Sequence, residues 1–331
     1  MRTPKFWYNQ KNTIQSFILK PVSWIYGLAR ELIINHSKTW EAPIPIICVG
    51  NLVTGGQGKT PTALSICNAL KHNNKIVHFI SRGYRGANRG PLLVNPKSNT
   101  ANEVGDEPLL LSEFAPTWVS ANREAGIKRA YAMGAEIIVM DDGFQNPSVK
   151  KDLSIIVIDG EVGFGNGNLI PAGPLREEIA NGLLRANFVV IIGKDIFSLK
   201  DTLTSLVSQT SPMPIKIYKA ELKPNTNASL LNNEKVFAFT GIGRPEKFFN
   251  TLVDIGCNII GKRDFADHHK YTEKEISNLL KIAKKENAKL VTTSKDYVRL
   301  NTSQQKNIIA LPIKLHWSDS TALDSIIKPL I

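Results

Sequence analysis

A lysine and a threonine at the end of a glycine-rich segment are the residues best able to carry out chemistry in this chain. Residues 49–61 read VGNLVTGGQGKTP, and Lys59 and Thr60 follow directly on the last glycine. In a P-loop the backbone N–H groups cradle phosphates, the lysine reaches the β and γ phosphates, and the threonine hydroxyl binds Mg²⁺. A simple turn between a strand and a helix would explain the glycines but not the Lys-Thr pair. The segment therefore predicts a nucleotide-binding site.

The segment departs from the usual G-x-x-x-x-G-K-T pattern at its first glycine. That position is Val53, whereas Gly55 and Gly56 bring the flexible part of the loop closer to the lysine. The residues expected to contact the nucleotide are Val53, Thr54, Gly55, Gly56, Gln57, Gly58, Lys59 and Thr60.

Two adjacent carboxylates follow an apolar run further along the chain. Asp141 and Asp142 come directly after residues 137–140, which read IIVM. Paired carboxylates at the end of a buried strand suit Mg²⁺, which prefers hard oxygen ligands. A capped turn is the alternative, because Asp-Gly is a common turn pair. With a P-loop upstream the metal is favoured, so we expect Thr60, Asp141 and Asp142 to lie near Mg²⁺.

Two more segments offer an acceptor for a proton. Residues 103–108 (EVGDEP) set carboxylates in a turn, and residues 264–271 (DFADHHKY) set a histidine pair beside an acid. A kinase acting on a hydroxyl group needs such an acceptor near the γ phosphate. We hypothesise that an acid from the first segment and a histidine from the second form a dyad. The alternative for each segment alone is a turn or a solvated face.

A P-loop alone does not define a reaction, and two other classes of protein are alternatives to a kinase. A GTPase would carry Asn-Lys-x-Asp, but in residues 193–195 (GKD) and 294–296 (SKD) the aspartate follows the lysine directly. A non-catalytic membrane-binding protein would leave the P-loop and its acids without a role. These observations favour a kinase, and an assay of ATP turnover separates it from a binding protein.

The elements that must position these residues alternate between apolar runs and helical stretches. This order predicts a doubly wound parallel α/β sheet of the P-loop NTPase kind. The expected strands of this sheet are residues 44–49, 76–80, 137–140, 155–158 and 188–192, with helices at 62–72 and 123–133. After a polar stretch the alternation resumes, which predicts a second, smaller α/β lobe. Its expected strands are residues 236–239, 289–292 and 308–311, with a helix at 272–285. The predicted divisions of the chain are residues 1–40, 41–222 and 223–331.

The first 40 residues differ in composition from the rest of the chain. They hold three of the five tryptophans, and lysines and arginines alternate with apolar residues at helical spacing. This pattern is typical of an amphipathic helix lying in a membrane interface, and the alternative is a helix packed on the core with its tryptophans buried. Lys20 and Arg30 interrupt the apolar stretch, so it fits neither a signal peptide nor a membrane span of about 20 residues.

The overall composition narrows the partners and the compartment. A formal net charge of +12 over 331 residues indicates an anionic partner, either phosphates, nucleic acid or an acidic membrane surface. The three cysteines are isolated and lack metal-ligand spacing, which argues for a reducing compartment and against a zinc site. We expect a cytoplasmic protein, either free or attached to a surface.

Taken in order, these segments resemble the tetraacyldisaccharide 4'-kinase family of lipid A biosynthesis. The segments that carry the resemblance after the P-loop are 81–84 (SRGY), 104–108 (VGDEP), 141–145 (DDGFQ), 169–177 (LIPAGPLRE), 240–245 (TGIGRP), 265–269 (FADHH) and 292–296 (TTSKD). The family fold has two α/β/α lobes, with the P-loop in the first, and a membrane-associating N-terminal helix. Transfer of the γ-phosphate of ATP to the 4'-hydroxyl of tetraacyldisaccharide 1-phosphate is the activity that the resemblance implies. The main alternative is a P-loop kinase for another glycolipid or small molecule.

The resemblance also assigns roles residue by residue. Asp106 matches the catalytic aspartate of the family and His268 its histidine partner, with Lys59, Asp141 and Asp142 completing the catalytic set. The residues expected to contact the substrate are Arg82, Tyr84, Arg123, Arg176 and Glu177. ATP and Mg²⁺ are the implied cofactors, and the implied place is the anionic cytoplasmic face of the bacterial inner membrane. No nucleic acid and no obligate protein partner are implied.

The chain departs from the family pattern at two positions. Ser294 stands where the family usually has glutamate, and Asn146 stands where it usually has histidine. We assign no role to either residue.

Overall fold

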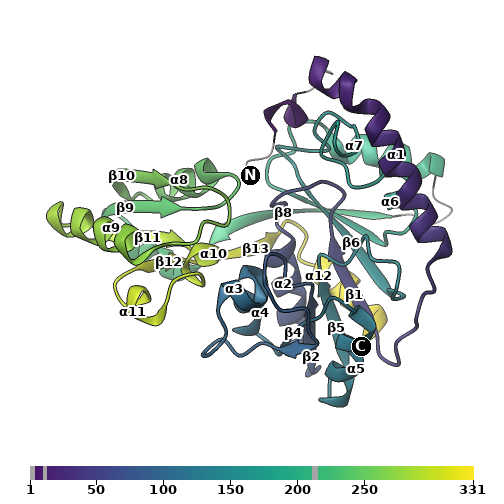
Figure 1. Ribbon diagram of the computed structural model, residues 1–331, viewed down its shortest axis with the longest axis horizontal. Coiled ribbons are helices and arrows are strands. Elements are labelled where there is room, and N and C mark those ends of the chain that lie inside the picture. Colours follow the sequence, from purple (N-terminus) through teal and green to yellow (C-terminus); the bar gives the residue numbers. More distant parts are fainter. Residues whose placement is uncertain (1–3, 10–12, 211–214) are drawn as a thin grey trace.

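The computed structural model describes residues 4–9, 13–210 and 215–331, which form two β-sheets of unequal size, each covered by helices (Figure 1). Within these residues the larger sheet has nine strands in the order β13-β8-β7-β6-β1-β5-β2-β4-β3. Its strands are β1 (Ile46–Gly50), β2 (Val77–Ser81), β3 (Leu92–Leu93), β4 (Thr117–Val119), β5 (Ile137–Asp141), β6 (Leu153–Asp159), β7 (Phe188–Ile192), β8 (Lys216–Pro224) and β13 (Ile313–Trp317). All neighbours pair in parallel except β3 with β4 and β13 with β8, which are antiparallel.

The central strands are buried on both faces because helices cover each side. The helices α2 (Lys59–His72), α4 (Asp106–Ser112) and α12 (Ala322–Ile327) share one apolar core with the sheet. A second core lies on the other face, where α5 (Arg123–Ala132), α6 (Ile179–Leu183) and α7 (Leu199–Thr210) pack. Continuous apolar runs such as IIVM suit strands enclosed in this way. The predicted α/β class with a P-loop sheet is confirmed.

The smaller sheet is parallel throughout and has the order β10-β9-β11-β12 among the described residues. Its strands are β9 (Lys235–Thr240), β10 (Asn258–Asp264), β11 (Lys289–Thr293) and β12 (Ile309–Leu311). One face packs on α8 (Pro245–Asp254) and the other on α9 (Glu273–Lys285), each through its own apolar cluster. Short helices α10 (Ser294–Tyr297) and α11 (Thr302–Gln305) follow β11.

The end of the chain returns to the larger sheet. Strand β13 pairs antiparallel with β8, and α12 packs on α2. The sequence pattern predicts that all of residues 223–331 belong to the second lobe, whereas β13 and α12 pack on the first. The return was not foreseen because residues 313–317 (IKLHW) form a short edge strand that alternates apolar and polar residues, unlike the continuous runs of the central strands.

The N-terminal helix α1 (Ile14–His36) runs along one side of the first lobe (Figure 1). Thr13 caps it by accepting a hydrogen bond from Ser16 N, and the helix continues through Pro21. Its large apolar side chains point away from the body: Phe17 is 71% exposed and Trp24 is 67% exposed. Among the described residues, no helix combines the length and the apolar character needed to cross a membrane.

Candidate active site

The glycine-rich loop connects β1 to α2, so its backbone lies at the N-terminus of a buried helix. Gly58 has φ +87°, and a Cβ there would meet Ile192 Cδ1 at 2.5 Å, so glycine is required. Lys59 is the first residue of α2, where free N–H groups and the helix dipole favour an anion. Burial lowers the pKa of Lys59, while Asp142 opposes that shift. The arrangement suits the phosphates of a nucleotide.

The first residues of the loop are held by the protein itself. Thr54 N donates to Pro174 O at 2.9 Å, and Val53 is buried and forms a bridge with Leu175. The side chain of Gln57 is buried and accepts a hydrogen bond from Asp159 N at 2.7 Å. Val53, Thr54 and Gln57 therefore brace the loop, which leaves Gly55, Gly56, Gly58, Lys59 and Thr60 as the other expected nucleotide contacts.

The acid pair lies at the carboxyl end of β5, next to the start of α2. Thr60 Oγ1 donates to Asp141 Oδ2 at 3.1 Å, and Lys59 Nζ lies 3.7 Å from Asp142 Oδ2. Burial raises the pKa of Asp141 to about 7. Burial would also raise the pKa of Asp142, but Lys59 and Arg176 outweigh it and lower that pKa to about 2. The two neighbours thus differ in charge near neutral pH.

Asp141 and Thr60 are suited to hold a divalent cation. Asp141 Oδ1 is buried and has no hydrogen-bond partner among the described residues. A buried carboxylate oxygen in this state fits a site that a hard cation would complete. No group of three or more His, Cys, Asp and Glu side chains gathers for a metal in the described part of the chain. Mg²⁺ in phosphate-transfer sites is usually held by one or two carboxylates together with the phosphates of the substrate.

Arg176 and Glu177 lie in the loop before α6, close to the pair Asp141 and Asp142. Arg176 donates two hydrogen bonds to Asp142, from Nη1 to Oδ1 at 2.7 Å and from Nη2 to Oδ2 at 3.3 Å. Glu177 is buried and accepts from Gln145 Nε2 at 3.1 Å, and it also pairs with Arg185. Arg176 is therefore in the site, whereas Glu177 is occupied by other side chains of the protein.

Asp106 and His268 meet across the two lobes. Asp106 begins α4 in the first lobe, and His268 lies in the loop after β10 in the second. His268 Nδ1 lies 2.6 Å from Asp106 Oδ2, although the residues are 162 positions apart. The ring of Tyr84 packs edge-on against His268, with the centroids 5.8 Å apart. The structure thus brings together the acid and the histidine of the hypothesised dyad.

Arg299, to which no sequence motif pointed, binds the acid of the Asp106–His268 dyad. Arg299 Nε donates to Asp106 Oδ2 at 2.8 Å, and its Nη1 donates to Asp296 Oδ1 at 2.7 Å. Burial raises the pKa of Asp106, but the hydrogen bond to His268 and the charge of Arg299 outweigh it, so the pKa is lowered. Arg299 lies outside every segment of the resemblance, so no motif pointed to it.

Further contacts also join the two lobes. Lys295 Nζ lies 2.9 Å from Glu107 Oε1, and Asp159, at the end of β6, accepts from Arg244 Nη1 at 2.7 Å and from Lys247 Nζ at 2.6 Å. Glu107 in turn interacts electrostatically with Lys59. The dyad and the P-loop therefore belong to one charged site.

The remaining candidates for substrate contacts lie near the same edge of the sheet. Arg82 and Tyr84 are exposed, whereas Arg123 is buried and donates from Nη1 to Ser120 O. Burial, with the nearby charge of Arg82, lowers the pKa of Arg123 to about 10. The Nε of Arg123 is buried and lacks a hydrogen-bond partner among the described residues. The two arginines are close enough to interact electrostatically, so together they make this edge of the sheet favourable for an anionic group.

The two departures from the family pattern make local contacts. Asn146 Oδ1 accepts from Ser148 N at 3.0 Å, and Ser294 Oγ donates to Leu311 O at 3.4 Å. Neither contact involves the groups around Lys59 or Asp106.

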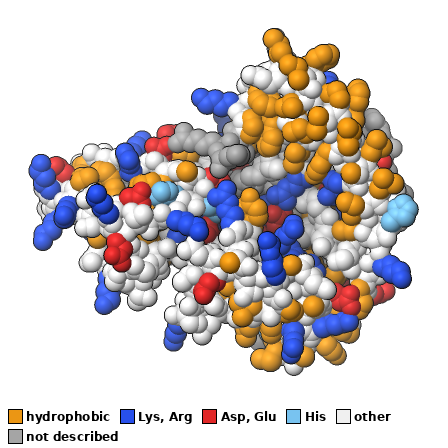
Figure 2. Space-filling view, in the orientation of Figure 1, with side chains coloured by type: hydrophobic (Ala, Val, Ile, Leu, Met, Phe, Trp, Pro, Cys, Tyr) orange, Lys and Arg blue, Asp and Glu red, His pale blue; other side chains and the backbone are white. Residues whose placement is uncertain are grey.

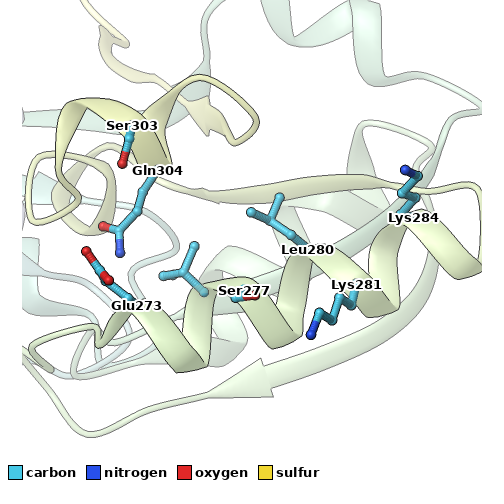
Figure 3. A pocket seen from close by; sticks show the side chains of 8 residues that line it. Glu273, Ser277, Leu280, Lys281, Lys284, Ser303 and Gln304 are labelled. Atoms are coloured by element: carbon cyan, nitrogen blue, oxygen red, sulfur yellow. The ribbon is translucent and has the colours of Figure 1, made fainter.

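A surface hollow elsewhere shares no residue with this site. It has a volume of about 420 Å³ and is lined by α9 and α11, with Lys281 and Lys284 at its edge (Figure 3). Its lining comes entirely from the outer part of the second lobe, so it is separate from the P-loop.

A parallel α/β sheet with a Gly-Lys-Thr loop at the start of a helix and an acid on the adjacent strand places this chain among the P-loop nucleotide-binding proteins. The family model for tetraacyldisaccharide-1-P 4'-kinase (LpxK) matches residues 15–331. The tetraacyldisaccharide 4'-kinase of Rhodospirillum centenum is 42% identical to this chain, and the match covers 100% of this chain and 97% of that protein. The enzyme of the same name from Rhodospirillum rubrum is 43% identical, and the match covers 100% of this chain and 98% of that protein. The chain belongs to the tetraacyldisaccharide 4'-kinase family.

A solved structure agrees with this assignment. The LpxK of Aquifex aeolicus, solved in complex with ATP, is 25% identical, with a TM-score of 0.76. The match covers 96% of this chain and 99% of that one. The two-lobed fold is therefore shared along nearly the whole length.

Proposed function

We propose that this protein transfers the γ-phosphate of ATP to the 4'-hydroxyl of a tetraacyldisaccharide 1-phosphate, giving ADP and the 1,4'-bisphosphate. The observation that carries the proposal is the 2.6 Å contact between His268 and Asp106. It sets a proton acceptor beside a P-loop, which is what transfer to a hydroxyl group needs and what binding of a nucleotide alone does not need.

In the proposed reaction, the oxygen of the sugar hydroxyl attacks the γ phosphorus and the bond to the bridging oxygen of ADP breaks. The loop N–H groups and Lys59 stabilise the charge that develops on the phosphate oxygens. The Asp106–His268 pair takes the hydroxyl proton, and Arg299 keeps Asp106 oriented and ionised. Arg176 holds Asp142 beside Lys59, so the lysine is positioned before substrate arrives.

Mg²⁺ fits this site, with Thr60 and Asp141 as the residues that would hold it. When bound, it would neutralise charge on the phosphate oxygens. Arg82 and Arg123 are the proposed contacts for an anionic group of the lipid, and Tyr84 is proposed to contact the sugar near His268.

The activity is tested by incubating the purified protein with γ-labelled ATP and tetraacyldisaccharide 1-phosphate in mixed micelles. We expect label in the bisphosphorylated lipid and an equal amount of ADP. A disaccharide that lacks the 4'-hydroxyl should accept no label. Turnover of ATP without labelled lipid would overturn the proposal, and preferential labelling of another glycolipid would support the alternative acceptor.

We also propose that the protein lies on the anionic cytoplasmic face of the inner membrane, with α1 in the interface. Apolar side chains gather over α1 on the visible face (Figure 2), and the chain carries a net charge of +12. An apolar helix face on a basic protein suits an anionic lipid surface. Phe17→Ser and Leu28→Ser should lower flotation with anionic vesicles and leave ATP binding intact. Unchanged flotation would contradict this placement.

The division of the chain is part of the same proposal. Residues 1–40 form the membrane segment, residues 41–222 form the P-loop lobe, and residues 223–331 form the second lobe, except that the last strand and helix pack on the first.

A further inference from the structure

The inner face of α1 lies unusually close to the loop that precedes the active-site arginine. Ser23 is buried, its Oγ donates to Leu169 O at 2.8 Å, and it accepts from Ala172 N at 3.0 Å. A Cβ at Gly27 would meet Leu169 Cδ1 at 3.0 Å. Small residues thus let the helix backbone approach this loop, and polar contacts hold it there.

One turn further along, α1 reaches the active-site residues themselves. Tyr26 Oη donates to the backbone carbonyl of Arg176 at 3.0 Å. Arg30 Nη2 lies 3.6 Å from Glu177 Oε1, and the side chains are 17% and 5% exposed. Tyr26 and Arg30 are four residues apart, so they occupy the same side of the helix. This side of α1 therefore faces the Arg176–Glu177 pair.

The peptide that Tyr26 holds is also held from the P-loop side. Arg176 N donates to Leu52 O at 2.7 Å, while its guanidinium grips Asp142. We propose that Tyr26 and Arg30 are positioning residues, which fix Arg176 and Glu177 relative to the P-loop and so link the seating of α1 on a lipid surface to catalysis. This inference rests on the proposed kinase function.

The two faces of α1 then have separate tasks. The outer face carries large exposed apolar side chains, whereas in the described part of the chain only Ser16 and Ser23 of α1 are buried. The ring of Tyr26 packs against the apolar core of the first lobe, while the polar inner contacts of Ser23 and Tyr26 are hydrogen bonds to backbone atoms and set the position of the loop. A bilayer that fixes the outer face would reduce the motion of the helix and hold Arg176 in register with Asp142.

The test uses the full chain with substitutions on the inner face. Tyr26→Phe removes only the hydroxyl, and Arg30→Met removes the charge near Glu177. We expect kcat at saturating ATP and lipid to fall about two- to tenfold for each, since a single hydrogen bond or ion pair is lost. Vesicle flotation should stay unchanged, and Arg30→Lys should recover part of the loss.

Glu31→Gln is the matched control on the same helix. Its carboxylate lies 3.5 Å from Asn181 Nδ2, on the exposed side, and it should leave kcat unchanged. A purely structural role for Tyr26 and Arg30 would lower the melting temperature without changing the kcat of the folded enzyme. Wild-type kcat in both inner-face variants would overturn the inference.

A second measurement separates failure of this inference from failure of the kinase proposal. Hydrogen exchange at the backbone amides of residues 175–177 should be faster in Tyr26→Phe than in the wild type or Glu31→Gln, whatever the lipid substrate is. Anionic vesicles should slow this exchange in the wild type and slow it less in Tyr26→Phe. Equal exchange in all three proteins would overturn the link between α1 and the site.

Discussion

The two halves of the active site are built in different ways. Lys59, Asp141 and Asp142 lie at the carboxyl ends of neighbouring parallel strands, β1 and β5, within one lobe. Asp106, by contrast, meets His268 and Arg299 across 162 and 193 positions of sequence. One half follows from sheet topology, and the other depends on how two lobes are placed.

Because of this difference, the two halves of the site should respond differently to substitutions and to changes in the contact between the lobes. Parallel strands bring their carboxyl ends to the same edge of the sheet. The phosphate half of the site (Lys59, Asp141 and Asp142) is therefore formed as soon as the sheet folds. The dyad exists only while the second lobe lies against α4, and it is held by contacts such as Lys295 with Glu107. Changes to the phosphate half should act on phosphoryl transfer directly, whereas changes to the dyad should also respond to lobe contacts.

The largest expected effect is loss of the dyad. Asp106→Ala and His268→Ala should each lower kcat by about 10²–10⁴-fold, because the hydroxyl loses its proton acceptor. If the pair acts as one unit, the double variant should lose little more than either single variant. Initial rates with saturating ATP and lipid measure this.

His269→Gln is the control for the dyad, because this neighbour contacts Glu275 at 3.1 Å instead of Asp106. It should retain nearly normal kcat. Losses that multiply in the double variant would show that the two residues act separately and that assembly across the lobes does not create a unit.

The phosphate half should give the next largest effect. Lys59→Met should lower kcat by about 10²–10³-fold, since it removes a charge aimed at the transferring phosphate. Lys71→Met, at the other end of α2 with its Nζ on Phe114 O, removes the same charge away from the loop. A kcat within about threefold of the wild type for Lys59→Met would refute a catalytic P-loop.

The phosphate half of the site is also the half that could be predicted best from the sequence. An apolar strand, a glycine loop and a Lys-Thr pair are contiguous, so their spatial relation follows from a single strand-loop-helix unit. The run at residues 188–192 is β7 to the residue, and the expected helix at 62–72 begins three residues earlier, at Lys59. Local patterns suffice where the chain itself links the parts.

The parts that could not be predicted depend on packing between distant segments. Arg299 is one of many basic residues, and only the docking of α10 against α4 places it on Asp106. The pattern of α1 predicts an apolar face directed at a membrane interface, but it does not indicate that Tyr26 and Arg30, on the other side of the helix, contact Arg176 and Glu177. Nor does any local pattern indicate that the side chain of Gln57 accepts a hydrogen bond from Asp159 N, 102 positions away.

A moderate effect is expected from loosening the anchor of the dyad. Arg299→Lys keeps the charge but cannot bridge both Asp106 and Asp296, because an ammonium lacks the planar fork of a guanidinium. We expect the free energy of unfolding, from urea titration, to fall by about 1.5–3 kcal/mol for the lost charged hydrogen bond. Arg263→Lys, on the exposed strand β10, should change it by less than about 0.5 kcal/mol. Equal stabilities of the two variants would contradict the anchoring role.

The smallest expected effect is on how the free energy of unfolding changes with acid pH, through the contact between the lobes. Burial raises the pKa of Glu107, but Lys295 outweighs it and the pKa is lowered, as it is for Asp106. A carboxyl whose folded pKa lies below its unfolded value of about 4 contributes stability that is full above that pH. This contribution is lost as the pH falls through the folded pKa, with a slope of at most about 1.4 kcal/mol per pH unit for each group.

Lys295→Met turns this dependence into a test of the lobe contact. Without the ammonium, burial of Glu107 is opposed only by the smaller effects of His268 and Lys59, so its pKa rises and protonation costs less stability as the pH falls below about 4. The variant should be less stable than the wild type at neutral pH, and its stability should fall less steeply in acid. Lys289→Met breaks an exposed pair with Glu234 instead, and it should leave the acid slope as in the wild type. Urea unfolding at a series of pH values gives both slopes. If Lys295→Met kept the wild-type slope, the acid sensitivity would come from groups other than Glu107, and the contact between Lys295 and Glu107 would not be what makes the dyad half respond to acid.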